Sequence, residues 1–75
     1  MEYSEKLRIY ERAKRIVESN EIDWDDKYDL IFSEEISQKF NFDYYDPDTS
    51  YKEDVEAFIS AFDEYMRKQK IISQL

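Results

Sequence analysis

The chain contains no glycine and only one proline, Pro47, among its 75 residues. Glycine adopts positive φ angles without steric cost, and the tight hairpin turns of β structure depend on such residues. Proline is the residue that interrupts a helix most strongly. Because both are so scarce, the sequence favours helices joined by connections over a hairpin-rich β fold.

Two segments have the apolar periodicity of amphipathic helices. The first covers about residues 3–19, and we expect Asn20 to end it in the left-handed conformation. The second begins after Ser50, which forms a capping box with Glu53 three residues later. It continues through four turns of apolar positions toward a basic C-terminal end.

The middle of the chain is harder to assign from its pattern. Asp23 could cap a helix that runs toward Asn41, and a break near Ser33 would divide this helix in two. Residues 40–45 alternate apolar and polar side chains, as a strand does. A single short strand is not stable alone, so we interpret this stretch as an extended connection that packs on the core. A strand that pairs across a dimer is the alternative.

These elements predict an all-α fold, a small bundle of three helices, or of four short ones if the middle segment is divided. Residues 1–75 form a single small acidic domain. The residues expected to be largely buried are Leu7, Tyr10, Val17, Trp24, Ile31, Val55, Phe58, Ile59 and Phe62. A chain of this length buries only about 60% of its unfolded surface. No cysteine is present to add a disulfide, so a homodimer built on the aromatic helix faces is one hypothesis.

The net charge of −8 is concentrated in the middle of the chain. Residues 20–56 carry thirteen acids and three bases, whereas the segments on either side each have a net charge of +1. Phosphate contacts require a basic surface, so direct binding to nucleic acid is disfavoured. A protein partner with a basic surface is the more natural expectation.

This charge predicts an acidic binding face in the middle segment, and its alternative is an acidic surface that only keeps the protein soluble. In its sharpest form the face would mimic DNA and occupy a nucleic-acid-binding protein. Long-range attraction would make such binding fast and sensitive to salt. The candidate partner-binding residues are Asp23, Asp25, Asp26, Asp29, Glu34, Glu35, Asp43, Asp46 and Asp48.

The stretch DYYDPDTSYKED, residues 43–54, has some of the features of a metal site. Asp46, Asp48 and Ser50 match the first ligands of a calcium-binding EF-hand loop, but Tyr51 and Ala57 replace its glycine and its bidentate acid. A loop that starts at Asp23 fails in a similar way. The stretch is better explained as a turn and a helix cap, so we expect no metal and no cofactor.

The composition also argues against catalysis and against a membrane location. Without histidine, cysteine or glycine, the chain lacks the usual nucleophile–base pairs and the glycine-rich phosphate loops. It has no apolar run of the roughly 20 residues that span a bilayer, and its charged N-terminal segment does not resemble a secretory signal. We therefore expect a non-enzymatic cytoplasmic protein that does not bind membranes.

Two stretches of the middle segment resemble known sequences. WDDKYDLIFS at residues 24–33 and DYYDPDTSY at residues 43–51 are similar to stretches in small acidic accessory proteins of lambda-like bacteriophages and prophages. The resemblance contains no chemical motif and identifies no target. It implies a phage-encoded, non-enzymatic protein that acts on host or phage machinery in the bacterial cytoplasm.

Overall fold

The computed structural model describes residues 2–33, 35–40 and 49–74. Its elements are α1 (Tyr3–Glu18), α2 (Trp24–Ile31) and α3 (Tyr51–Ser73). The described residues include no strand. The predicted all-α three-helix bundle is therefore confirmed.

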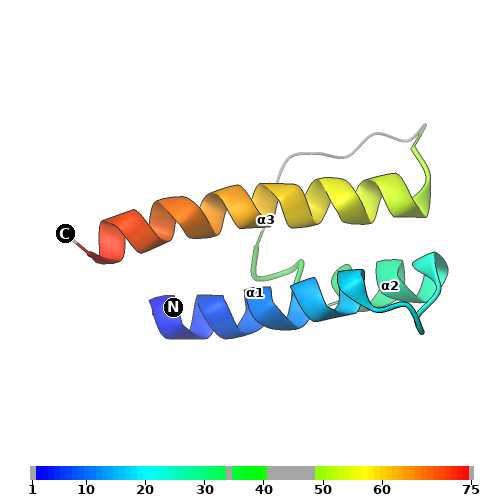
Figure 1. Ribbon diagram of the computed structural model, residues 1–75, viewed down its shortest axis with the longest axis horizontal. Coiled ribbons are helices and arrows are strands. Elements are labelled where there is room, and N and C mark those ends of the chain that lie inside the picture. The colour runs from blue at the N-terminus through cyan, green and yellow to red at the C-terminus, as the bar shows by residue number, and fades with distance from the viewer. Residues whose placement is uncertain (1, 34, 41–48, 75) are drawn as a thin grey trace.

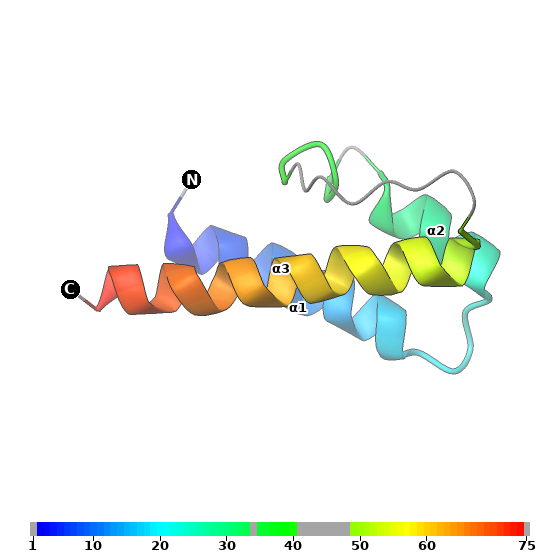
Figure 2. The same cartoon turned by 90° about the horizontal axis from the view of Figure 1, so that it is seen from above.

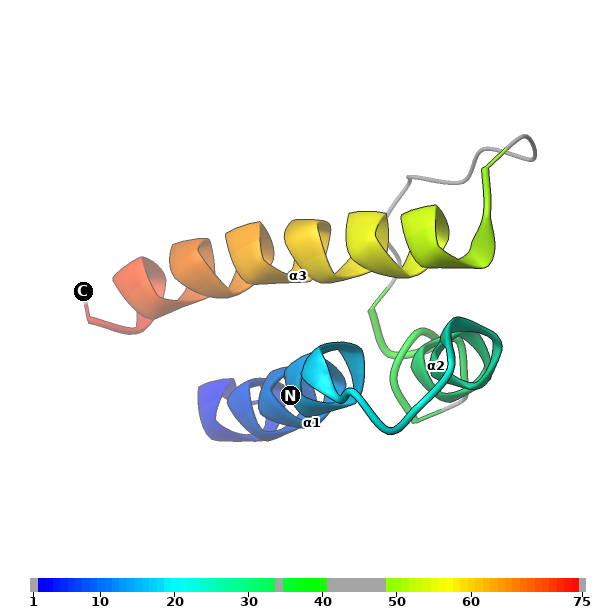
Figure 3. The ribbon, with the colours of Figure 1, turned by 45° about the vertical axis from the view of Figure 1, so that its right-hand side comes forward.

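The longest helix, α3, covers the two shorter ones. In Figure 1, α1 and α3 run antiparallel, so that the start of α1 and the end of α3 lie at the same end of the molecule. Seen from above, α1 passes obliquely beneath α3 (Figure 2). Figure 3 shows α1 and α2 side by side beneath α3. The core consequently lies between α3 and the layer formed by α1 and α2.

The end of α1 differs from the prediction. No described residue has a positive φ angle, so Asn20 does not end the helix in the left-handed conformation. The chain leaves α1 at Ser19 in an extended conformation, with φ −67° and ψ 132°. A tertiary contact explains the difference: Lys27 Nζ donates a hydrogen bond to the Val17 carbonyl at 2.7 Å. This bond gives a hydrogen-bond donor to one of the terminal carbonyls of α1, which a left-handed cap would otherwise provide from the backbone.

The middle segment is divided near Ser33, which is one of the two alternatives that the sequence left open. Helix α2 ends at Ile31, and Ser33 accepts backbone hydrogen bonds from Ile36 at 3.3 Å and Ser37 at 3.1 Å. Residues 35–39 form turns, so the second short helix that a break near Ser33 would allow is not formed by these residues. Phe40 is buried, as expected for a connection that packs on the core. Residues 41–45 of the strand-like stretch lie outside the described residues.

Aromatic rings of α3 form the centre of the core. Phe58 and Phe62 are fully buried, and their ring centroids are 5.8 Å apart. Phe62 also meets Tyr10 of α1 at 5.2 Å and Phe40 at 4.4 Å. Such ring pairs contribute about 0.5–1.5 kcal/mol each beyond the area that they bury. The buried hydrophobic residues are Tyr10, Ala13, Ile31, Ile36, Phe40, Val55, Phe58, Phe62 and Met66.

Four of the residues expected to be largely buried are only partly buried. These are Leu7, Val17, Trp24 and Ile59, which pack against the margin of the core. Helix α3 and the layer of α1 and α2 do not cover each other's apolar surfaces completely. The outer edges of the apolar stripes on α1 and α3 therefore remain accessible. Ala13, Ile36, Phe40 and Met66 instead complete the buried set.

Candidate interaction surfaces

The outer side of α2 carries exposed carboxylates. Asp25, Asp26 and Asp29 are exposed, whereas Lys27 and Ile31 of the same helix are buried, so the acids point away from the core. Asp23, also exposed, is the N-cap residue but makes no side-chain cap bond. We call these four residues, Asp23, Asp25, Asp26 and Asp29, the acidic face. Among the described residues, none of the four takes part in an ion pair.

Lys27 and Trp24 anchor α2. Lys27 is only 4% exposed, its ammonium group lies 4.1 Å from the centre of the Trp24 ring, and it bonds to the Val17 carbonyl. Lys52 of α3 lies 5.6 Å from the same ring. A cation at the C-terminal end of α1 also complements the helix dipole. These contacts join all three helices and hold the acidic face in a defined position.

The other candidate partner-binding residues do not all belong to this face. Glu35 is exposed, but it forms an ion pair with Arg12 of α1 at 2.5 Å. Its charge is therefore already balanced within the molecule. Glu34, Asp43, Asp46 and Asp48 lie outside the described residues. The structure thus brings four of the nine candidates together on one helix and its cap.

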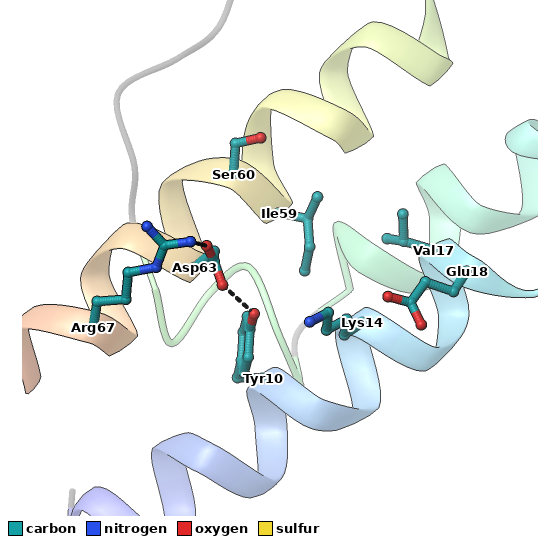
Figure 4. A pocket seen from close by; sticks show the side chains of 8 residues that line it. All are labelled: Tyr10, Lys14, Val17, Glu18, Ile59, Ser60, Asp63 and Arg67. Atoms are coloured by element: carbon teal, nitrogen blue, oxygen red, sulfur yellow. Dashed lines mark hydrogen bonds and ion pairs between the residues drawn. The ribbon is translucent and has the colours of Figure 1, made fainter. Parts of the chain in front are cut away.

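A shallow hollow of about 300 Å³ lies between α1 and α3 (Figure 4). At one end, the Tyr10 hydroxyl donates to Asp63 Oδ1 at 2.5 Å, and Arg67 pairs with Asp63 Oδ2 at 2.9 Å. Burial and the bond to Asp63 raise the pKa of Tyr10 to about 12. Val17 of α1 and Ile59 of α3 provide apolar surface. Lys14 and Glu18 border the same hollow from α1.

The polar groups at this end of the hollow are bonded to one another. Tyr10, with a pKa near 12, remains protonated at neutral pH, and Asp63 is already shared between two donors. Within the described ranges, no group of three or more acidic side chains could hold a metal ion.

Sequence reasoning did not find Lys27 or the bond between Tyr10 and Asp63. A weak local signal existed for Lys27, because Trp24 lies three residues earlier, on the same side of the helix. No local signal existed for Tyr10 and Asp63, which are 53 residues apart. Only the packing of α1 against α3 brings them together.

The fold defines the class of the protein as a small all-α helical bundle. None of the helices in the described part of the chain has the length and apolarity required to cross a membrane. No family model matches the chain, and comparisons with curated proteins and with solved structures give no match. The resemblance to phage accessory proteins therefore stays a prediction.

Proposed function

We propose that the protein is a non-enzymatic interaction module that binds a basic protein surface through the acidic face of α2. The observation that carries this proposal is the position of Asp29. It lies in the last turn of α2, where no basic residue is present and where the helix dipole disfavours negative charge. It also follows Asp25 by four residues, a spacing at which like charges repel.

The charges on the acidic face thus oppose one another, and the rest of the described molecule does not neutralise them. Asp25 and Asp26 gain some stabilisation from the N-terminal end of α2, but Asp29 does not. A basic partner would relieve this repulsion on binding. Soluble surfaces do not require such clustering, because acids that are spread over the surface maintain solubility equally well.

An apolar residue accompanies the acids. Leu30 is 41% exposed and follows Asp26 by four residues, so it lies on the same side of α2. Interfaces commonly combine a central apolar contact with surrounding polar groups. We therefore propose a partner whose surface presents lysine or arginine around an apolar contact for Leu30.

Two further properties belong to the same proposal. The resemblance of the middle segment supports a phage-type accessory role in the bacterial cytoplasm, and the absence of histidine and cysteine supports a role without catalysis. Mimicry of DNA is the sharper form of the binding hypothesis. It requires that the partner be a nucleic-acid-binding protein, and that DNA compete with this chain for it.

The test compares two variants that each lose four negative charges. The first changes the acidic face to Asn at Asp23, Asp25, Asp26 and Asp29. The control changes four exposed acids elsewhere to Gln: Glu2, Glu5, Glu11 and Glu56. A partner captured from the source cell with wild-type protein is then measured against both variants at about 50 and about 300 mM salt, concentrations that differ strongly in screening.

We expect the acidic-face variant to bind more weakly than the control. Its association rate should fall more than its dissociation rate rises, because exposed charges act mainly on encounter. The difference from wild type should shrink at high salt. Equal binding of the wild type and the acidic-face variant at both salt concentrations would contradict the proposal.

A further inference from the structure

The hollow between α1 and α3 leaves apolar side chains uncovered on two helices. Val17 and Ile59 occupy positions that helical periodicity assigns to the core, yet both are only partly buried and line the hollow. All the residues that line it belong to α1 and α3, and none belongs to α2. The acidic face is therefore a separate surface.

Of the four charged residues at the hollow, Asp63 and Arg67 pair with each other, and the other two, Lys14 and Glu18, have an order that complements itself. Lys14 and Glu18 are exposed, lie one helical turn apart on α1, and both border the hollow (Figure 4). Neither takes part in an ion pair among the described residues. If two such helices meet antiparallel, each Lys14 faces the Glu18 of the other copy, so one contact satisfies all four charges.

We propose that this hollow is the interface of a homodimer, in which a second copy of this chain packs its α1 antiparallel against the α1 of the first. The pairing is isologous: Lys14 meets Glu18 of the second copy, and Glu18 meets its Lys14. Val17 and Ile59 of both copies become buried in the contact. The α1 and α3 helices of the two copies together form a four-helix bundle.

A second copy fits this surface better than an unrelated partner for two reasons. A two-fold axis reproduces each ion pair automatically, whereas another protein would have to carry the same charges in the opposite order. The core between the three helices is also small, and a partner subunit is a common support for domains with a small core. The acidic face takes no part in this contact. The dimer would therefore have two exposed acidic faces, one on each copy.

The test uses charge reversal at the two paired positions. The molar mass is measured by sedimentation equilibrium from about 1 μM to about 1 mM, a range that spans weak to moderate affinities. Wild type should change from one chain to two within this range. Lys14→Glu and Glu18→Lys should each weaken the dimer by about tenfold or more, because symmetry turns two attractions into two repulsions.

Mixing the two variants provides the decisive measurement. A Lys14→Glu copy carries two acids at the contact and a Glu18→Lys copy carries two bases, so an equimolar mixture should dimerise as tightly as wild type, at concentrations where each variant alone is largely monomeric. If either substitution weakened the dimer by damaging the fold of its own copy, mixing the two variants would not restore the dimer. Circular dichroism of each variant should match wild type, since both residues are exposed.

A matched control exists on α3. Glu64 and Lys68 are also four residues apart and exposed, form an ion pair at 3.5 Å, and do not line the hollow. Lys68→Glu should therefore leave the dimer unchanged. Wild type with the mass of one chain at every concentration, a mixture that stays monomeric, or equal weakening by Lys68→Glu would each overturn the proposal. These results do not depend on whether the acidic face of α2 binds a partner.

Discussion

At the scale of single residues, Lys27 connects the helices in a way that apolar packing alone does not. A lysine is rarely buried unless its charge has partners, and here the partners are a backbone carbonyl and an aromatic ring. The bond to Val17 replaces the terminal cap that α1 lacks. Tyr10 plays a comparable part between α1 and α3, where its hydroxyl bonds to Asp63.

Lys27→Met keeps the apolar stem of the side chain but removes the donor. We expect a loss of about 1.5–3 kcal/mol of unfolding free energy, because a charged hydrogen bond disappears and a carbonyl loses its partner. Urea unfolding measures the change. Lys39→Met, at an exposed position outside the helices, serves as the control and should be nearly neutral. Equal stabilities of the two variants would show that the bond to Val17 contributes nothing.

Tyr10→Phe tests the phenol and its raised pKa. At pH 7 the variant should lose about 0.5–1.5 kcal/mol with the bond to Asp63. The folded pKa of Tyr10 is raised to about 12 from its usual value of 10.0, so the contribution of its bond to Asp63 is full below pH 10 and is lost as the pH rises toward 12. The stability difference between wild type and variant should therefore shrink above pH 10. Urea unfolding at a series of pH values measures it, and a difference that widens would contradict the assignment.

At the scale of elements, α2 and α3 distribute their charges differently. Helix α3 has acids in its first turn and Lys70 in its last, and the Ser50 side chain accepts a hydrogen bond from the Glu53 amide at 3.3 Å. Buried Asp54 accepts a further bond from the Thr49 hydroxyl. Helix α2 has acids in its first turn too, but it has no side-chain cap bond and no base in its last turn. Its stability therefore depends more on tertiary contacts.

Ser50→Ala removes the cap of α3. The expected loss is about 0.5–2 kcal/mol, the usual contribution of a serine at this position. Thermal unfolding followed by circular dichroism measures it. Ser4→Ala provides the matched control, because Ser4 is exposed within α1 and does not cap that helix. The cap would be unimportant if both variants had the melting temperature of wild type.

Asp29→Asn tests whether the acidic face opposes the stability of α2. We expect a gain of about 0.3–1 kcal/mol, because the substitution removes a charge that both the helix dipole and Asp25 disfavour. Asp25→Asn should be nearly neutral, since it removes the same repulsion but also a favourable charge from the first turn. Urea unfolding compares the two variants. A loss of stability in Asp29→Asn would indicate that this carboxylate has a structural role.

At the scale of the whole molecule, a small aromatic core between α3 and the layer of shorter helices holds the fold together. The molecule measures 39 × 25 × 19 Å, so few side chains can be far from solvent. Phe58 and Phe62 are the largest of the fully buried side chains. Small domains have total stabilities of only about 5–15 kcal/mol, so the loss of one such ring is a large fraction of the total.

Phe58→Ala should destabilise the protein by about 3–5 kcal/mol through lost burial and the cavity that remains. Much of the helical circular dichroism should disappear at a temperature where wild type is folded. Leu30→Ala is the control for a large apolar residue at an exposed position, and it should change the melting temperature little. A Phe58→Ala protein that melts like wild type would contradict the assignment of this residue to the core.

The sequence by itself determined the features that depend on neighbouring residues. Apolar periodicity predicted α1 and α3, the motif at Ser50 and Glu53 predicted where α3 begins, and Asp23 and Ser33 indicated a helix and its division in the middle segment. The acids of α2 were also found, because the negative charge of the chain is concentrated in its middle segment. Such features involve residues within one or two helical turns, so the order of the chain already contains them.

Only the tertiary structure decided which parts of each apolar stripe are covered and which charges are balanced. The burial of Lys27, the pairing of Arg12 with Glu35, and the partial exposure of Val17 and Ile59 depend on residues far apart in the chain. Periodicity indicates which side of a helix is apolar, but it does not indicate how much of that side the helices packed against it will cover. That coverage is set by how α3 lies across α1 and α2, and local pattern contains no information about it.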